Sequence, residues 1–145
     1  KNRHGRFRDS DLLREVFERT LGYLKEREQF GVPIGSFQAL QHRAARLYVE
    51  LELLDSAVAA ALAAIDANSA NSANSAELPR LASLAKARAA DLAVTLCNEA
   101  VQLHGGIGVT DEYDLGLFLK RARVLQHSLG DAAFHRDRYA VLMGF

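Results

Sequence analysis

Only two prolines, Pro33 and Pro79, interrupt the 145-residue sequence, and alanine and leucine dominate the rest. Proline ends or kinks a helix, whereas Ala and Leu are strong helix formers, so long helices suit most of the chain. No stretch alternates apolar and polar residues over the length of a useful strand. The sequence therefore predicts an all-α fold.

Apolar spacing and helix-breaking residues indicate where the helices lie. Leu13, Val16 and Phe17 begin an i, i+3, i+4 stripe that Asp9 or Ser10 is placed to cap. Because helices this long, joined by short turns, pack best as antiparallel neighbours, we expect an up-down four-helix bundle with an extra short C-terminal helix. The expected helices cover about residues 10–28, some thirty residues from 36, then 80–103, 115–126 and 131–142.

The length suits one domain with one core, spanning residues 1–145. The triplet Asn-Ser-Ala occurs three times between Asn68 and Ala76, and such small polar residues favour turns. We expect a mobile low-complexity loop at about 68–77. The sequence begins with Lys1 rather than methionine, so we expect a fragment of a longer chain.

Charge and composition exclude several functions. Lys plus Arg and Asp plus Glu both total 18, which leaves no basic excess for a nucleic-acid partner. No apolar run approaches the roughly 20 residues of a membrane span, and no secretory signal opens the sequence. The single cysteine, Cys97, fits a reducing compartment, so we expect a cytoplasmic protein. Abundant Ala and Arg point to a bacterial source.

The sequence gives little support for a metal site or a catalytic nucleophile. No Glu has a His three residues later, as a di-iron bundle requires, and no HExxH motif occurs. Cys97 lies among apolar residues and is interpreted as a buried small hydrophobe. The histidines are interpreted as polar or packing residues rather than metal ligands: His4, His42, His104, His127 and His135.

Two segments resist a purely structural interpretation. In the first, Arg27, Gln29 and Phe30 precede Gly31 at a helix end, where a guanidinium, an amide and an aromatic ring can bind a phosphate and a ring system. The second reads Gln-Leu-His-Gly-Gly-Ile-Gly over residues 102–108. On general grounds its glycines are better explained as a helix C-cap. Alternatively, they let backbone N–H groups approach a pyrophosphate.

In this order the two segments resemble the C-terminal helical domain of the acyl-CoA dehydrogenases, flavoenzymes that desaturate acyl-CoA thioesters between the α and β carbons. The resemblance covers about residues 21–142, apart from the Asn-Ser-Ala repeat. It includes the Phe-Gln-Ala-Leu-Gln start of the second helix and Lys-Arg-Ala-Arg at 120–123. It implies a bundle that packs against an identical or homologous subunit and contacts the FAD held there.

Carried over by position, the resemblance assigns cofactor contacts. Arg27 would pair with the FAD pyrophosphate, and Gln29 and Phe30 would line the nucleotide half of the cofactor. The cradle would be completed by Gln102, Gly105 and Gly106. Acyl-CoA is the implied substrate, but the residues do not define its acyl group.

One departure from the family pattern concerns the catalytic base. Family members commonly carry a Glu-Gly pair whose Glu removes the acyl α-proton, but Leu129 and Gly130 stand here, and leucine accepts no proton. The Thr and Gln that usually follow align with Asp131 and Ala133. Asp131 is better interpreted as a helix N-cap than as a displaced base. Some relatives place the base on an earlier helix, but no acid precedes Asp9.

These observations support three hypotheses. The first is the C-terminal domain of an acyl-CoA dehydrogenase-like subunit, which donates FAD contacts to its neighbour and lacks its own base at Leu129. The family's N-terminal helical and middle β-domains do not fit into 145 residues, so we expect the chain alone to be inactive. The second is a helical oligomerisation module without a cofactor role. The third is full activity with a base supplied upstream. The family suggests a homotetramer or a two-plus-two heterotetramer.

Overall fold

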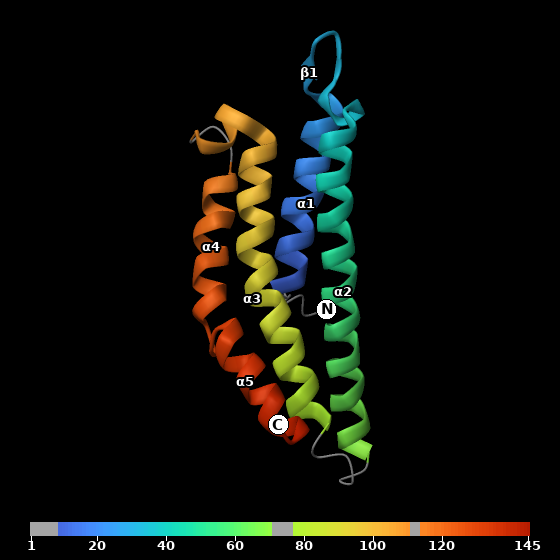
Figure 1. The fold of residues 1–145 in the computed structure, drawn as a ribbon, viewed down its shortest axis with the longest axis vertical. Coiled ribbons are helices and arrows are strands. Elements are labelled where there is room, and N and C mark those ends of the chain that lie inside the picture. Colours follow the sequence, from blue (N-terminus) through green and yellow to red (C-terminus); the bar gives the residue numbers. More distant parts are fainter. Residues whose placement is uncertain (1–8, 71–76, 111–113) are drawn as a thin grey trace, which may run out of the picture.

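Helices account for most of the computed structural model, which describes residues 9–70, 77–110 and 114–145. In the described residues the helices are α1 (Asp9–Glu26), α2 (Gln38–Ala70), α3 (Glu77–His104), α4 (Leu115–His127) and α5 (Ala132–Met143). The chain runs up α1, down α2, up α3 and down through α4 and α5 (Figure 1). The predicted all-α up-down bundle with an extra C-terminal helix is confirmed.

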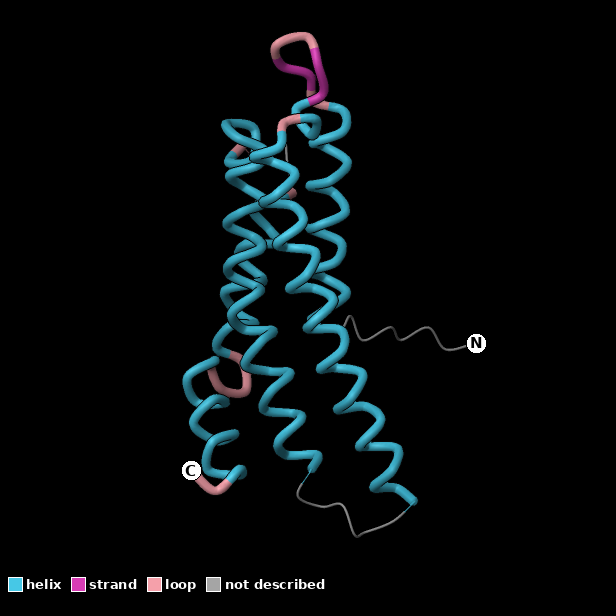
Figure 2. The backbone as a smooth tube through the Cα atoms, turned by 45° about the vertical axis from the view of Figure 1, so that its right-hand side comes forward, coloured by secondary structure: helices cyan, strands magenta, loops and turns pink. Residues whose placement is uncertain are grey.

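Helix α3 is the central element, because it packs against each of the other four helices. Helices α4 and α5 follow one another along it and together take the place of a fourth long helix (Figures 1 and 2). The inner faces of the helices supply one apolar core, as the i, i+3, i+4 stripes predict. Its largest fully buried apolar side chains are those of Leu13, Val16, Leu51, Leu54, Leu96 and Cys97.

Polar contacts join neighbouring helices around this core. Arg14 of α1 binds Glu52 of α2 at 2.9 Å, and Arg43 of α2 binds Glu99 of α3 at 2.8 Å. Lys86 of α3 donates from Nζ to the carbonyl oxygen of Leu125, 2.6 Å away in the last turn of α4. A cation at this helix end satisfies a carbonyl that lacks an intrahelical partner.

The predicted first helix ends two residues early, at Glu26, because the chain turns into a β-hairpin. Strand β1 (Glu28–Gln29) pairs antiparallel with β2 (Val32–Pro33), and Phe30 and Gly31 form the turn with φ angles of 56° and 77°. Positive φ at both central residues matches the twist of a two-residue hairpin. The sequence predicted a short turn here but missed the strands. The 3-10 turn Ile34–Ser36 leads into α2.

Two helix ends extend further than predicted. Helix α2 continues to Ala70 and so includes the first Asn-Ser-Ala triplet, and α3 begins at Glu77 rather than after Pro79. Proline is tolerated there because the N–H groups of the first helical turn have no intrahelical acceptor. Of the loop predicted at 68–77, residues 71–76 lie outside the described residues. Among the described helices, none is long and apolar enough to cross a membrane.

Candidate functional site

The two segments singled out in the sequence lie at the same end of the bundle. Helices α1 and α3 point in the same direction, so the hairpin that follows α1 and the glycines that follow α3 emerge together (Figure 1). The two helix ends are in contact, because the rings of Tyr23 and His104 stack with their centroids 4.3 Å apart. This stack fixes the spacing between the two motifs.

The hairpin presents its side chains to solvent. Phe30 is 93% exposed and meets the edge of Phe37 at a centroid distance of 6.1 Å. The Gln29 amide donates to the carbonyl of Glu28 at 2.9 Å, and within the described residues the exposed Arg27 guanidinium forms no ion pair. The hairpin is closed by a bond of 2.8 Å from the Ile34 N–H to the Arg27 carbonyl. Its backbone is therefore ordered while its functional groups stay available.

The three glycines after α3 meet different structural requirements. Gly105 has a φ of 64° and leads from α3 into the 3-10 turn Gly105–Val109, as a C-cap glycine does. At Gly108, a Cβ atom would lie 2.8 Å from the carbonyl oxygen of Val101. Gly106 has no positive φ, and a Cβ there would meet nothing within 4 Å. The C-cap interpretation therefore accounts for Gly105, and packing accounts for Gly108. Neither accounts for Gly106.

His104, in the middle of the second motif, is a packing residue. It is buried, and its Nδ1 lies 2.7 Å from the carbonyl oxygen of Ala100. Burial lowers the pKa of His104, which keeps the ring neutral against Tyr23. Among the described residues, no three His, Cys, Asp or Glu side chains cluster to hold a metal ion.

Gln102 and Gly106 are exposed beside the hairpin end. In the described part of the chain, no hydrogen bond or ion pair joins Arg27, Gln29 or Phe30 to this glycine segment. The two motifs are linked by the Tyr23–His104 stack. These exposed residues therefore lie on the surface of one end of the bundle. An exposed guanidinium such as that of Arg27 can bind a phosphate group.

Leu129 lies elsewhere, in the turn between α4 and α5 and away from the hairpin end (Figure 1). It is 91% exposed and has a φ of 62°, which is unusual for a leucine. His135 Nε2 lies 2.9 Å from the Leu129 carbonyl oxygen, and the ring Nδ1 lies 3.4 Å from the Ser83 hydroxyl. Because a carbonyl only accepts, Nε2 carries the proton and donates it. No pattern in the sequence predicted that His135, beside the Ser83 hydroxyl, would donate a hydrogen bond to the Leu129 carbonyl.

Asp131 is the N-cap of α5. Its carboxylate accepts a hydrogen bond of 2.8 Å from the Phe134 N–H. The prediction that it is a cap is confirmed. Cys97 is buried as expected, and burial raises the pKa of its thiol to about 11, so thiolate is scarce at neutral pH.

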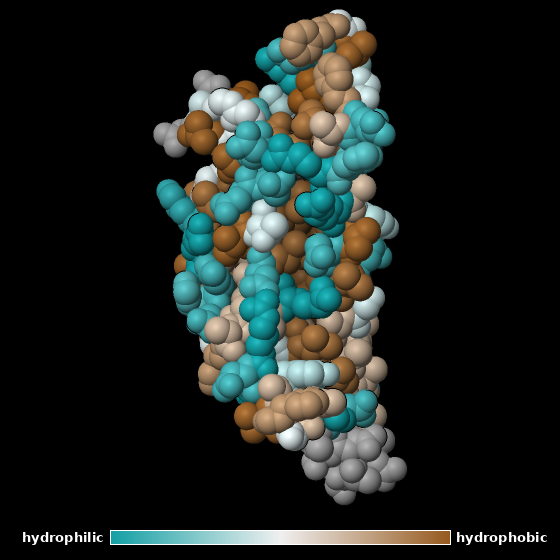
Figure 3. All heavy atoms as spheres, viewed as in Figure 1, coloured by the Kyte–Doolittle hydropathy of each residue, from teal (hydrophilic) through white to brown (hydrophobic). Residues whose placement is uncertain are grey.

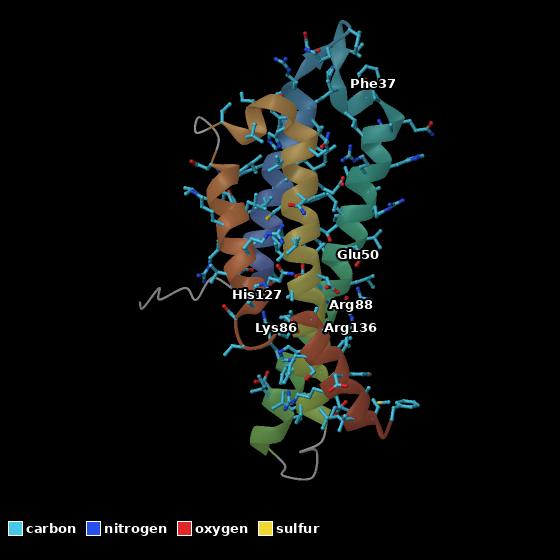
Figure 4. The ribbon with its side chains drawn as sticks, turned by 60° about the vertical axis from the view of Figure 1, so that its left-hand side comes forward. Phe37, Glu50, Lys86, Arg88, His127 and Arg136 are labelled. Atoms are coloured by element: carbon cyan, nitrogen blue, oxygen red, sulfur yellow. The ribbon has the colours of Figure 1, made fainter. Side chains whose placement is uncertain are left out.

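A charged groove of about 540 Å³ lies on another side of the bundle, between α2, α3 and α5. Glu50, Arg88 and Arg136 come from these three helices and lie close together (Figure 4). Glu50 binds Arg88 at 3.3 Å, and Arg136 binds Asp91. Most of the charged side chains that line the groove are therefore paired within the chain, so the groove is not part of the candidate cofactor site.

Comparison with known proteins adds to this geometry. The family model described as "Acyl-CoA dehydrogenase, C-terminal domain" matches residues 10–142. The chain is 42% identical over 111 residues to acyl-CoA dehydrogenase IpdE2 of Mycolicibacterium smegmatis, covering 77% of this chain and 32% of that protein. It is 33% identical over 125 residues to the probable acyl-CoA dehydrogenase YngJ of Bacillus subtilis, covering 86% and 31%. The chain thus spans about a third of these relatives.

Solved structures show the same fold. A variant of the Tcur3481–Tcur3483 steroid ACAD superposes with a TM-score of 0.83 at 29% identity, covering 94% of this chain and 36% of that one. The ChsE4–ChsE5 complex from Mycobacterium tuberculosis superposes with a TM-score of 0.84 at 24% identity, covering 94% and 35%. The first of these joins two proteins, Tcur3481 and Tcur3483, and the second is a complex of ChsE4 with ChsE5.

Proposed function

The chain belongs to the acyl-CoA dehydrogenase family, as its C-terminal helical domain, and from this we propose that its hairpin end completes the FAD site of a neighbouring subunit. The observation that carries the proposal is the exposed Arg27 guanidinium, which has no ion pair in the described residues, at the same bundle end as the unobstructed backbone of Gly106. A diphosphate ligand requires a cation to pair with its charge and accessible backbone N–H groups to donate to its oxygens.

The residues at this end fit FAD by their chemistry. Arg27 would hold the diphosphate, with the side-chain amides of Gln29 and Gln102 beside it and the Gly106 backbone in close approach. Phe30 would lie against the nucleotide half of the cofactor, because its ring has little intramolecular contact beyond Phe37. Gly105 would shape the backbone that carries Gly106.

Bound FAD would accept a hydride during α,β-desaturation of an acyl-CoA thioester. This chain's residues would bind and orient the cofactor rather than move the substrate proton. The Leu129 side chain takes no proton, and the Asp131 carboxylate caps α5. We therefore propose a subunit that lacks the usual base and is inactive by itself.

A base-bearing partner would complete the enzyme. In the proposed assembly that partner, identical in fold but carrying the carboxylate, holds the acyl-CoA and the FAD. The pairing of two proteins in Tcur3481–Tcur3483 and in the ChsE4–ChsE5 complex supports unequal subunits. A base on a segment upstream of Lys1 is the remaining route to activity within one chain.

The test is FAD retention in a complex of this chain with a co-expressed homologous subunit. Visible absorption after gel filtration should show flavin with the partner and none without it. Arg27→Ala should lower FAD affinity by about 10- to 100-fold, since a charge-assisted contact contributes about 1.5–3 kcal/mol. Arg121→Ala, an exposed arginine of α4, is the matched control and should leave FAD retention unchanged. Equal retention in both variants would refute the cofactor role.

That refuting result would favour the second candidate, a helical oligomerisation module. The paired charges and the central position of α3 would suit such a scaffold. In that case neither Arg27→Ala nor Gln102→Ala would change flavin content, while charged residues on helix faces between subunits would abolish assembly. If flavin is retained, Leu129→Glu in the complex tests whether a carboxylate at this position adds activity.

A further inference from the structure

The groove between α2, α3 and α5 has one positive charge in excess. Figure 3 shows hydrophilic residues, in teal, gathered along the middle of the face that these helices share. The charged side chains that line the groove are those of Arg46, Glu50, Arg88, Asp91 and Arg136. Each of the two acids binds one arginine, so the third arginine, Arg46, has no acid of the groove left to bind.

Arg46 interrupts a row of ion pairs between α2 and α3. Because these helices are antiparallel, Arg43 of α2 meets Glu99 of α3 at 2.8 Å, and further along α2 Glu50 meets an arginine of α3 at 3.3 Å. Arg46 lies between these two pairs, where the α3 residue that lines the groove is Thr95. In the part of the chain that the structure describes, Arg46 forms no ion pair and the Thr95 hydroxyl forms no hydrogen bond. Two hydrogen-bond donors are therefore available on opposite walls of the groove.

These two donors fit a single carboxylate group. A guanidinium binds both oxygens of a carboxylate through two parallel hydrogen bonds, and the Thr95 hydroxyl adds a third donor. A ligand with two negative charges is disfavoured, because Glu50 and Asp91 line the same groove and would repel the second charge. The chemistry of the groove therefore selects a monoanion.

The deeper part of the groove is apolar and selects the rest of the ligand. Leu84, Ala87 and Leu92 of α3 line it, and the last two of these are buried beneath the charged side chains. A second hollow of about 230 Å³ shares Leu84 and Ala87 with the groove and extends it along α5 to Tyr139. Small-molecule sites usually have volumes of about 300–1,000 Å³, so the groove of about 540 Å³ is large enough for the apolar body of a small ligand.

We propose that the groove between α2, α3 and α5 binds a small monocarboxylate with an apolar body. Arg46 and Thr95 hold the carboxylate, and the apolar body lies against Leu84 and along the hollow that ends at Tyr139. The proposal is independent of the FAD contacts, because the groove lies on another side of the bundle from the hairpin. It also accounts for a cation on α2 at a position where α3 provides no acid.

Naphthylacetate is the probe for this site, because it joins one carboxylate to an apolar ring system. Titrated into the isotopically labelled chain, it should shift the amide NMR signals of Arg46, Arg88 and Thr95 and saturate with a dissociation constant of about 1 mM or lower. Naphthaleneacetamide, a neutral analogue of the same shape, should bind at least about ten times more weakly, because it presents no charge to Arg46. Equal affinity for the two ligands, or shifts confined to residues outside the groove, would overturn the proposal.

Substitutions at the two donors test the carboxylate contact directly. Arg46→Ala should weaken naphthylacetate binding by about 10- to 100-fold, and Thr95→Val by about 2- to 10-fold, because they remove a charge-assisted and a neutral hydrogen bond. Arg121→Ala is the matched control: it removes an exposed arginine of α4, which does not line the groove, and should leave the dissociation constant unchanged. An Arg46→Ala chain that binds naphthylacetate as tightly as the native chain would refute the site.

A gain of affinity tests the charge balance of the groove. Glu50→Gln removes one acid and releases Arg88 from its ion pair, so a second guanidinium becomes available to the ligand. Naphthylacetate binding should then tighten by about two- to five-fold, which matches the range of exposed ion pairs, while naphthaleneacetamide binding stays the same. Unchanged or weaker carboxylate binding in this variant would contradict the proposed selection by charge.

Discussion

At the residue scale, we expect alanine substitutions at three neighbouring glycines to have three different effects. Gly108→Ala should destabilise the fold by about 1–3 kcal/mol, because the new Cβ meets the Val101 carbonyl. Gly105→Ala should cost about 1–2 kcal/mol through its positive φ. Gly106→Ala should change stability by less than about 0.5 kcal/mol, yet lower FAD retention in the complex. Urea unfolding and flavin absorbance measure the two effects; a large stability loss at Gly106 would contradict this assignment.

His104 makes the fold sensitive to acid. Burial lowers its folded-state pKa, so the unfolded chain binds the extra proton first. The free energy of unfolding should therefore fall as pH drops below the ordinary histidine value of about 6.5 and level off below the folded-state pKa. His104→Phe keeps an aromatic ring on Tyr23 and should weaken this decline. Urea titrations at several pH values compare the two proteins; equal slopes would rule out His104 as the source.

The backbone at Leu129 is also a single-residue feature. A left-handed φ is unfavourable for leucine by about 1–2 kcal/mol, and the side chain gains little from packing because it is exposed. Leu129→Gly should therefore stabilise the chain by about 0.5–1 kcal/mol after the entropy cost of glycine. Thermal unfolding measures it, with Leu117→Gly in α4 as the control that should destabilise. A loss of stability at 129 would mean that its side chain makes contacts the fold needs.

At the scale of elements, the cap of α5 separates two interpretations of Asp131. Asp131→Ala should cost about 0.5–2 kcal/mol, because the Phe134 N–H loses its acceptor, and Asp131→Asn should restore most of it. Urea unfolding of the isolated chain measures both. If Asp131→Asn destabilised as much as Asp131→Ala, the carboxylate charge rather than the cap geometry would be what matters.

The helices and strands also show which features of the fold the sequence patterns could predict. Apolar spacing located all five described helices, and Asp131 and Gly105 marked two ends, because these signals are local. The hairpin was missed because its strands have two residues each, too short for any alternation. The start of α3 before Pro79 was missed because proline is both a helix breaker and a good first-turn residue. The two motifs lie at the same end of the bundle because α1 and α3 run in the same direction. Only the folded structure gives that direction.

For the whole molecule, α3 determines cooperative stability because every other helix packs on it. Leu96→Ala removes a buried side chain from its centre and should cost about 2–5 kcal/mol. Leu117→Ala, at an exposed site, should change the free energy of unfolding by less than about 0.5 kcal/mol. Calorimetry of both variants compares them; similar small shifts would show that the helices unfold independently of α3.

Because the β-hairpin projects from the bundle, substitutions of its exposed side chains are easily misjudged as having no effect. Phe30 is almost entirely exposed, and Arg27 and Gln29 lie beside it outside the core. A library of variants sorted only by cellular abundance would therefore treat these three positions as replaceable and would enrich for changes that ease the turn. Stability-guided engineering of this chain would discard the hairpin's side chains first, without any loss of yield to signal the change.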